Sequence, residues 1–196
     1  MAINKALKFV AQLSIDKASQ ALSRFIRVGA KIEMDDIYMA DISEITGKLS
    51  AESDEVVGAF IDLGGDVKFK FLFFVNAQDS CLLADLILRR PVGTTTTYDQ
   101  YTSSAVQEIA NILSCGIASV FTSDFQLGIT ISPPTVIHDF VGTVFLEYFM
   151  SIAVEQNEVM MIETTFKIVQ QNINCHMFII PDSKTEKVLS YISNTL

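Results

Sequence analysis

Residues 71–79 read FLFFVNAQD, and residues 176–182 read HMFIIPD. Each stretch begins with an apolar run, which favours a strand, and then reaches a polar turn that contains an aspartate. Apolar residues at helical spacing follow in both places: Leu82, Leu83, Leu86 and Ile87 in one, and Val188, Leu189 and Ile192 in the other. A strand, a turn and a helix therefore occur twice, which indicates an internal duplication.

The repeat extends outward from these two stretches. Each half reads as helix, strand, helix, two strands and terminal helix. The long first helices are expected at about Asn4–Val28 and Asp99–Phe121. Between the long helix and the terminal helix of each half we expect a strand, a helix and two strands, in that order. In the first half they are expected near residues 31–39, 41–49, 55–63 and 71–75, and in the second near 126–131, 139–154, 159–169 and 176–180.

A connection between the halves is expected at Pro91–Thr97, because Pro and Gly interrupt regular structure and threonines in a row are poor helix formers. Neither half looks large enough to bury its apolar faces alone. We therefore predict a single domain over residues 1–196, with pseudo-repeat halves at about 1–90 and 98–196. The predicted fold class is α+β: a pseudo-two-fold duplicated α-β repeat with a shared, mostly antiparallel sheet and two long helices.

Composition excludes several classes of function. Apolar residues make up 49% of the 196 residues and charged residues 19%, which argues against disorder. A net charge of −9, with Arg89-Arg90 as the only adjacent basic pair, argues against a nucleic-acid partner. The cysteines, Cys81, Cys115 and Cys175, are odd in number and widely spaced, as in an intracellular protein with reduced thiols. Since we find neither a signal peptide nor an uncharged apolar run approaching about 20 residues, we expect a cytoplasmic protein without a membrane span.

The second long helix carries the residues with chemical potential. At about 100° per residue, Ser104, Glu108, Asn111 and Cys115 share one stripe, opposite an apolar arc that includes Ile109 and Leu113. Such a stripe is most often only the solvated face of an amphipathic helix. Asn is a poor residue inside a helix, because its side chain competes for backbone hydrogen bonds, and this hints at a separate reason for Asn111.

Other polar features predict no chemistry. His138 and His176 have no Cys or His partner at metal spacing, and Cys115 has no nearby His in sequence to activate it. Gly64-Gly65-Asp66 indicates a hairpin turn, and the acidic residues near Asp35 are typical of a solvated loop. We therefore expect no metal site.

The pattern Ser104-x-x-x-Glu108-x-x-Asn111, followed by Pro134, resembles the signature of the CheC, CheX and FliY phosphatases. The stretches RPVGTT at 90–95, SPP at 132–134 and FIIPD at 178–182 also resemble CheC sequences. The resemblance spans nearly the whole chain, and duplicated halves are what CheC members show.

The first half departs from this pattern. Its helix contains no Glu, and its only Asn is Asn4. Alignment of Ala21-Leu22-Ser23 with the first helix of the family puts Phe9 and Gln12 in the Glu and Asn positions and Asp35 in the Pro position. The resemblance therefore predicts one intact site, with Glu108 and Asn111 as catalytic residues and Ser104 and Pro134 as supporting residues.

The resemblance implies a hydrolase for the aspartyl phosphate of a CheY-like receiver, acting in chemotaxis or two-component signalling. In that family the Asn orients the attacking water and the Glu pairs with a receiver Lys. The Mg²⁺ belongs to the receiver, so the protein needs no cofactor of its own.

Two other functions stay open at this point. The chain could be a non-catalytic interaction module that binds a receiver, a CheD-like deamidase or a motor-switch component. The missing first motif favours this alternative, since half of the fold already lacks the chemistry. A small-molecule sensor is a third alternative, although the sequence shows no pocket signature.

Overall fold

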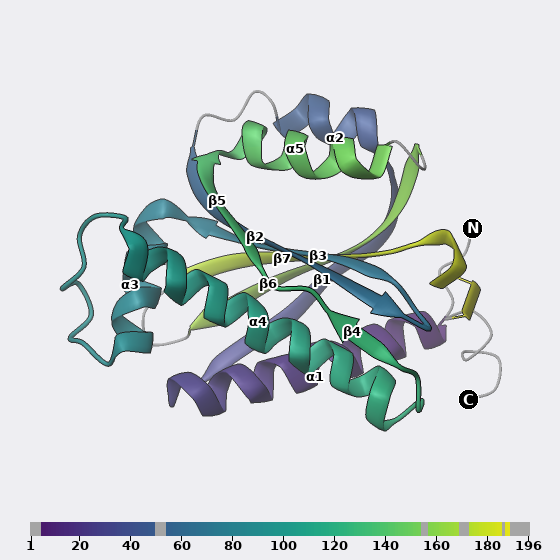
Figure 1. The fold of residues 1–196 in the computed structure, drawn as a ribbon, viewed down its shortest axis with the longest axis horizontal. Coiled ribbons are helices and arrows are strands. Elements are labelled where there is room, and N and C mark those ends of the chain that lie inside the picture. The colour runs from purple at the N-terminus through teal and green to yellow at the C-terminus, as the bar shows by residue number, and fades with distance from the viewer. Residues whose placement is uncertain (1–4, 50–53, 154–156, 169–172, 186, 189–196) are drawn as a thin grey trace.

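The computed structural model describes residues 5–49, 54–153, 157–168, 173–185 and 187–188. The first half contains α1 (Lys5–Ile26), β1 (Ala30–Asp41), α2 (Ile42–Leu49), β2 (Glu55–Gly65), β3 (Phe69–Asn76) and α3 (Ala77–Leu88). The second contains α4 (Gln100–Ser123), β4 (Ile129–Ile131), β5 (Thr135–Phe140), α5 (Val141–Ala153), β6 (Glu158–Ile168) and β7 (Ile173–Pro181), and residues 183–185 and 187–188 are helical. The two halves therefore share one order of elements, except that two short strands stand where the first half has β1 (Figure 1).

The strands exchange partners between the halves. In the described part of the chain they form one seven-stranded sheet in the order β1-β6-β7-β3-β2-β4, and β5 also pairs with β2. Every pairing is antiparallel, with β3 and β7 at the centre. The strands that follow the long helix of each half pair with the other half: β1 pairs with β6, and β4 and β5 both pair with β2. The predicted α+β fold, with a shared antiparallel sheet and two long helices, is confirmed.

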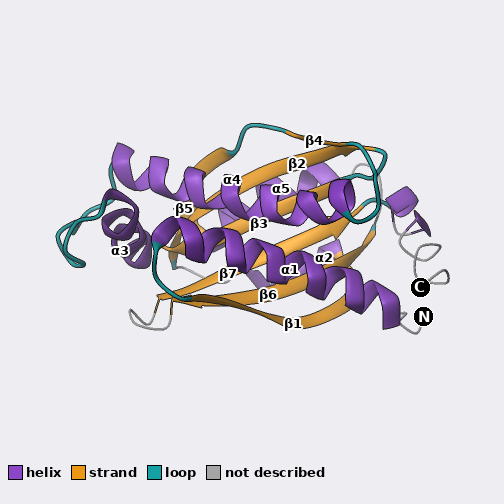
Figure 2. Cartoon of the chain, turned by 90° about the horizontal axis from the view of Figure 1, so that it is seen from below, coloured by secondary structure: helices purple, strands orange, loops and turns teal. Residues whose placement is uncertain are grey.

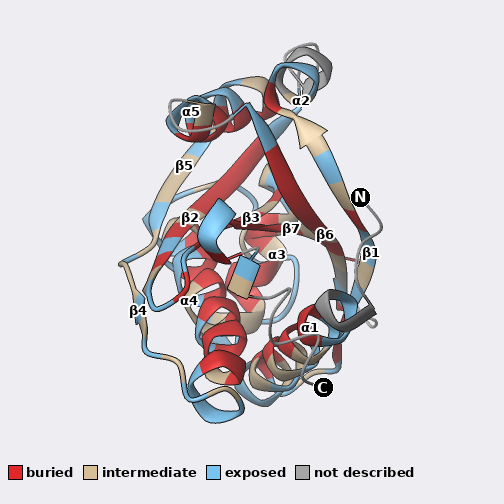
Figure 3. Ribbon diagram, turned by 90° about the vertical axis from the view of Figure 1, so that its right-hand side faces the viewer, coloured by how far each residue is buried: buried red, intermediate tan, exposed pale blue. Residues whose placement is uncertain are grey.

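Helices cover both faces of the curled sheet. In Figure 1, α1, α3 and α4 lie on one side of the sheet, and α2 and α5 lie on the other. The end-on view in Figure 3 shows buried residues on the inner surfaces of both layers. Alternate residues of a strand face opposite sides, so β3 sends Phe71 and Phe73 into the core under α1 and α4 and Leu72 into the core under α5.

Helix α4 is held at its start and along one face. The Asp99 carboxylate caps it by accepting hydrogen bonds from the backbone N–H groups of Tyr101 and Thr102, both at 2.9 Å. Ile109, Leu113 and Val120 are buried completely. In the described residues, α4 is the one helix with the length and apolarity of a membrane span, but 61% of its most apolar window is buried inside the protein. Core packing therefore accounts for its apolar residues.

The segment after α4 differs from the prediction. Only Ile129–Ile131 of the expected strand at 126–131 is a strand, a further strand runs from Thr135 to Phe140, and α5 begins at Val141 rather than near Asp139. Pro133 and Pro134 separate the two strands, because proline cannot donate to a β-ladder. The predicted turn at Gly64–Asp66 does connect β2 to β3; Gly65 has φ +121°, and a Cβ there would lie 2.2 Å from the Gly128 carbonyl oxygen.

Candidate functional site

The predicted polar stripe lies on the side of α4 that faces away from the sheet. Ser104, Glu108 and Cys115 are exposed, and Asn111 is half-buried. Because Glu108 and Asn111 are three residues apart on a helix, their side chains are neighbours about 5–6 Å apart at Cβ. The Asn111 carboxamide is therefore on the surface of the protein rather than packed into its core.

The Asn111 and Glu108 side chains are largely free of partners. The Cys115 thiol donates a weak hydrogen bond to Asn111 Oδ1 at 3.9 Å. Within the described residues, neither the Asn111 amide nitrogen nor the Glu108 carboxylate has any other hydrogen-bond or ion-pair partner. Both groups are thus free to bind another molecule.

Cys115 is not prepared for nucleophilic chemistry. Partial desolvation of the sulfur, together with the nearby Glu108 carboxylate, raises the pKa of its thiol. A raised pKa lowers the thiolate fraction at neutral pH, and the thiolate is the nucleophile.

The other two predicted residues, Ser104 and Pro134, each make a hydrogen bond within the protein. Ser104 Oγ donates to the Gln100 carbonyl oxygen at 2.9 Å, so this hydroxyl is engaged within its own helix. Pro134 lies in the connection between β4 and β5, and its carbonyl oxygen accepts a hydrogen bond from Gln107 Nε2 at 3.5 Å. This contact holds the proline loop against α4 next to Glu108. The sequence analysis missed Gln107, whose only signal was its place beside the motif.

Asn111 also lines a groove between α1 and α4. This concavity, of about 500 Å³, includes Lys17, Gln20 and Arg24 from α1 and Cys115 and Ser119 from α4. Lys17 is paired with Asp124 at 2.5 Å. The sequence analysis did not foresee the groove, because it depends on the contact of two helices from different halves.

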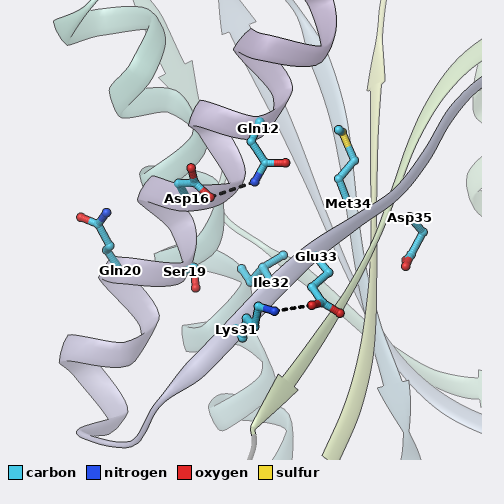
Figure 4. Close-up of a pocket in the computed structure, with 9 residues that line it drawn as sticks. All are labelled: Gln12, Asp16, Ser19, Gln20, Lys31, Ile32, Glu33, Met34 and Asp35. Atoms are coloured by element: carbon cyan, nitrogen blue, oxygen red, sulfur yellow. Dashed lines mark hydrogen bonds and ion pairs between the residues drawn. The ribbon is translucent and has the colours of Figure 1, made fainter.

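The corresponding surface of the first half has different chemistry. Phe9, in the Glu position, is 54% exposed, and Gln12, in the Asn position, donates from Nε2 to Asp16 Oδ1 at 2.9 Å. Asp35, in the Pro position, accepts from Thr165 Oγ1 at 2.7 Å. Figure 4 shows Gln12 turned toward Asp16 at the edge of a polar cleft of about 770 Å³ between α1 and β1. The first-half carboxamide is therefore occupied, and no carboxylate stands beside it at position 9.

Among the described residues, no group of three or more His, Cys, Asp or Glu side chains could hold a metal ion. His138 packs on the Tyr98 ring, with centroids 4.1 Å apart, and His176 stacks on Phe74 at 5.0 Å. Both histidines thus have aromatic packing partners.

Comparisons with known proteins bear on the segment around α4 and on the fold. Residues 102–138 match the model of the CheC-like family. The whole structure resembles FliY from Thermotoga maritima, with a TM-score of 0.76 and 15% identity over 100% of this chain and 99% of that chain. The segment around α4 thus resembles the CheC-like family, and the chain as a whole has the fold of FliY and CheX. The resemblance predicted from the sequence is therefore confirmed.

Two further structures show how widely the CheC/CheX/FliY fold is shared. A chain of the complex of CheX with CheY, BeF3 and Mg²⁺ from Borrelia burgdorferi has a TM-score of 0.53 and 18% identity over 87% of this chain and 96% of that chain. The FliM middle domain from H. pylori has a TM-score of 0.62 and 15% identity over 96% and 99%. Such likenesses establish the fold, whereas activity has to be argued from the site. The CheC-like segment contains Ser104, Glu108, Asn111 and Pro134.

Proposed function

We propose that this protein hydrolyses the aspartyl phosphate of a phosphorylated CheY-like receiver, with Glu108 and Asn111 as the residues that enter the receiver's active site. The proposal rests on one observation above all: an exposed carboxylate and an unengaged carboxamide nitrogen stand side by side on the outer face of α4. The family match over residues 102–138 supports it.

The proposed chemistry needs positioning more than covalent help. The Asn111 carboxamide can both donate and accept, so it can hold a water molecule in line with the phosphorus. The water oxygen bonds to phosphorus while the bond from phosphorus to the aspartyl oxygen breaks. One proton of the water stays on the phosphate product and the other goes to solvent. Glu108 pairs with a receiver lysine, which fixes the docked geometry.

The proposed reaction also determines the source of the metal ion and the cellular compartment. The Mg²⁺ that stabilises the phosphoryl group is the receiver's, so this chain supplies no metal ligand. A cytoplasmic location follows from a receiver substrate, and the free thiols of Cys81, Cys115 and Cys175 are consistent with a reducing compartment.

The direct test measures how long phosphate persists on the chemotaxis receiver of the same organism, charged with a small phosphate donor and Mg²⁺, with and without this protein. Asn111→Ala should lower the stimulated rate by roughly 100-fold while leaving the thermal unfolding curve unchanged, because the residue orients the water and does not fill the core. Asn157→Ala is the matched control, since Asn157 is exposed just before β6. Full activity of Asn111→Ala would remove this residue from the mechanism.

Glu108→Ala should weaken docking, raising KM for the phosphorylated receiver about tenfold by loss of a charge pair. Glu147→Ala serves as its control, because Glu147 is exposed on α5, across the sheet from α4. If binding and turnover both persist in Glu108→Ala, the docking role is wrong. A wild-type protein that binds the receiver without shortening the phosphate lifetime would instead be the interaction module considered above.

A further inference from the structure

The first half of the molecule supplies a cation beside the second half's motif. Helices α1 and α4 lie side by side on the same face of the sheet (Figure 2). Gly116 meets Ala18 at the crossing, and Lys17 reaches Asp124 near the end of α4, so the two helices run in opposite directions. Arg24, further along α1, therefore lies toward the earlier part of α4, and it lines the same groove as Asn111.

Arg24 is the uncompensated charge in this groove. Lys17, Lys31 and Lys70 each lie within 4 Å of a carboxylate. Within the described residues, Arg24 has no ion-pair or hydrogen-bond partner and is exposed. Asn111, Cys115 and the other residues of α4 that line the groove carry no positive charge. A free guanidinium thus stands across the groove from the proposed catalytic amide.

The net charge of the protein makes such a cation consequential. In the proposed reaction, a chain with a net charge of −9 must approach a receiver pocket that contains a dianionic acyl phosphate and the carboxylates that hold its Mg²⁺. Like charges oppose that encounter, and a local cation at the contact offsets the repulsion and sets the register. Arg suits this task, since its planar guanidinium can bind a carboxylate or phosphate in a bidentate manner.

We infer that Arg24 is a docking residue of the α4 site, contributed by the half that lacks the Glu and Asn of the motif, and that it binds the anionic rim of the receiver's phosphorylated pocket. This inference rests on the proposed function, because the receiver is its ligand. The site is then composite: α4 brings Glu108 and Asn111, and α1 brings the cation. Loss of the motif from α1 is compatible with a continued role for that helix in the same reaction.

A purely structural role for Arg24 makes a different prediction. Arg24 lies in the last turn of α1, where a cation is favourable to the helix dipole. That role would change stability slightly and would leave receiver binding as it is. The two roles can therefore be separated by kinetics.

The experiment compares initial dephosphorylation rates over a range of phosphorylated receiver concentrations for wild type, Arg24→Ala, Arg24→Lys and Arg24→Glu. Arg24→Ala should raise KM roughly fivefold with kcat little changed, Arg24→Glu should raise it further, and Arg24→Lys should recover part of the loss. The difference between wild type and Arg24→Ala should shrink as salt is added, because salt screens the pair. The matched control is Arg27→Ala, since Arg27 is exposed just beyond α1 and does not line the groove.

Arg24→Ala with wild-type KM at low salt, in a preparation where Asn111→Ala is inactive, would overturn the inference and leave the proposed function standing. If wild type itself does not hydrolyse the phosphate, the proposed function fails, and Arg24 is then tested by calorimetric titration with the BeF3-activated receiver. Weaker binding of Arg24→Ala than of Arg27→Ala supports the docking role in that case, and equal binding overturns it.

Discussion

Cys115, the residue beside the proposed catalytic amide, can be modified chemically to probe the site. Cys115 is exposed on the α4 stripe, with its sulfur 3.9 Å from Asn111 Oδ1, whereas Cys81 and Cys175 are buried. Partial desolvation of the sulfur by its neighbours, and after it the Glu108 carboxylate, raises the pKa of the Cys115 thiol, although the residue as a whole is exposed. The thiol is therefore mostly neutral at physiological pH and reports on its surroundings without taking part in the reaction.

We predict that N-ethylmaleimide modifies Cys115 first in the folded protein and that the adduct abolishes receiver dephosphorylation, because the added group stands against Asn111. Since the pKa is raised, the alkylation rate should stay low at neutral pH and should still be rising above about pH 8.5, the range in which an ordinary thiol reaches half ionisation. Mass spectrometry of digested protein gives the site and rate, and the phosphate-lifetime assay gives the activity.

Cys115→Ser provides the control, since its activity should be the same before and after treatment with the reagent. Modified wild-type protein that keeps its full activity would show that the Cys115 side of the stripe lies outside the contact with the receiver.

At the scale of residues, the sequence predicted correctly which side chains are neighbours within one helix. Glu108 and Asn111 share a face because helical spacing alone dictates it. The hydrogen bond from Gln107 to the Pro134 carbonyl and the place of Arg24 opposite Asn111 depend on packing between distant segments. A single arginine in the last turn of a helix is common, so nothing in the sequence around Arg24 indicated a functional role.

At the scale of elements, the groove that holds Arg24 and Asn111 depends on how closely α1 approaches α4. A Cβ added at Gly116 would lie 2.6 Å from Ala18 Cα and 3.0 Å from Ala18 N. These are backbone atoms, which cannot turn aside as a flexible side chain could. The absence of a side chain at Gly116 therefore sets the separation of the two helices at their crossing.

Gly116→Ala should lower the free energy of unfolding by about 1–3 kcal/mol, as expected for overpacking of a tight contact. The better helix propensity of alanine, worth roughly 1 kcal/mol, acts in the opposite direction and is outweighed by the backbone clash. Equilibrium unfolding in urea measures the change. The control is Gly29→Ala, because a Cβ at Gly29 meets nothing within 4 Å. A Gly116→Ala protein as stable as wild type would mean that the helices can separate without loss.

The elements differ in how well their sequences specify them. The long helices were predicted to within a few residues of their ends because they have strong periodicity, and α4 also has the Asp99 cap. Strand β5 was missed because its residues are all half-buried or exposed, so its apolar pattern is weak. Its position comes from pairing with β2, which no local pattern reveals.

At the scale of the whole molecule, the exchanged strands make the two halves depend on each other. Strand β1 pairs with β6, and β4 and β5 pair with β2, so the strands that follow the long helix of each half lie in the ladder of the other half. The pairing of β3 with β7 joins the halves at the centre of the sheet. A duplication could be predicted from the repeat of strand, turn and helix, but the exchange could not, because β1 could equally have paired within its own half.

This exchange predicts the behaviour of the separated halves. A cut between Thr96 and Thr97 falls in an exposed part of the connection and spares the hydrogen bonds that Thr94 and Thr95 donate to the Asp85 carboxylate. The fragment 1–96 would lack partners for β1 and one edge of β3, and the fragment 97–196 would lack partners for β5 and one edge of β7. Neither fragment should unfold cooperatively as a monomer, whereas an equimolar mixture should recover the transition of the intact chain.

Circular dichroism melting and sedimentation velocity test this, and the phosphate-lifetime assay adds a sharper criterion. The fragment 97–196 contains Glu108, Asn111 and Pro134, yet it should be inactive alone, since it lacks β2, which pairs with both strands beside Pro134, and Arg24 across the groove. Activity should return when fragment 1–96 is added, and should return with a raised KM when that fragment carries Arg24→Ala. Dephosphorylation by fragment 97–196 alone would instead show that the motif helix suffices and that the first half only stabilises it.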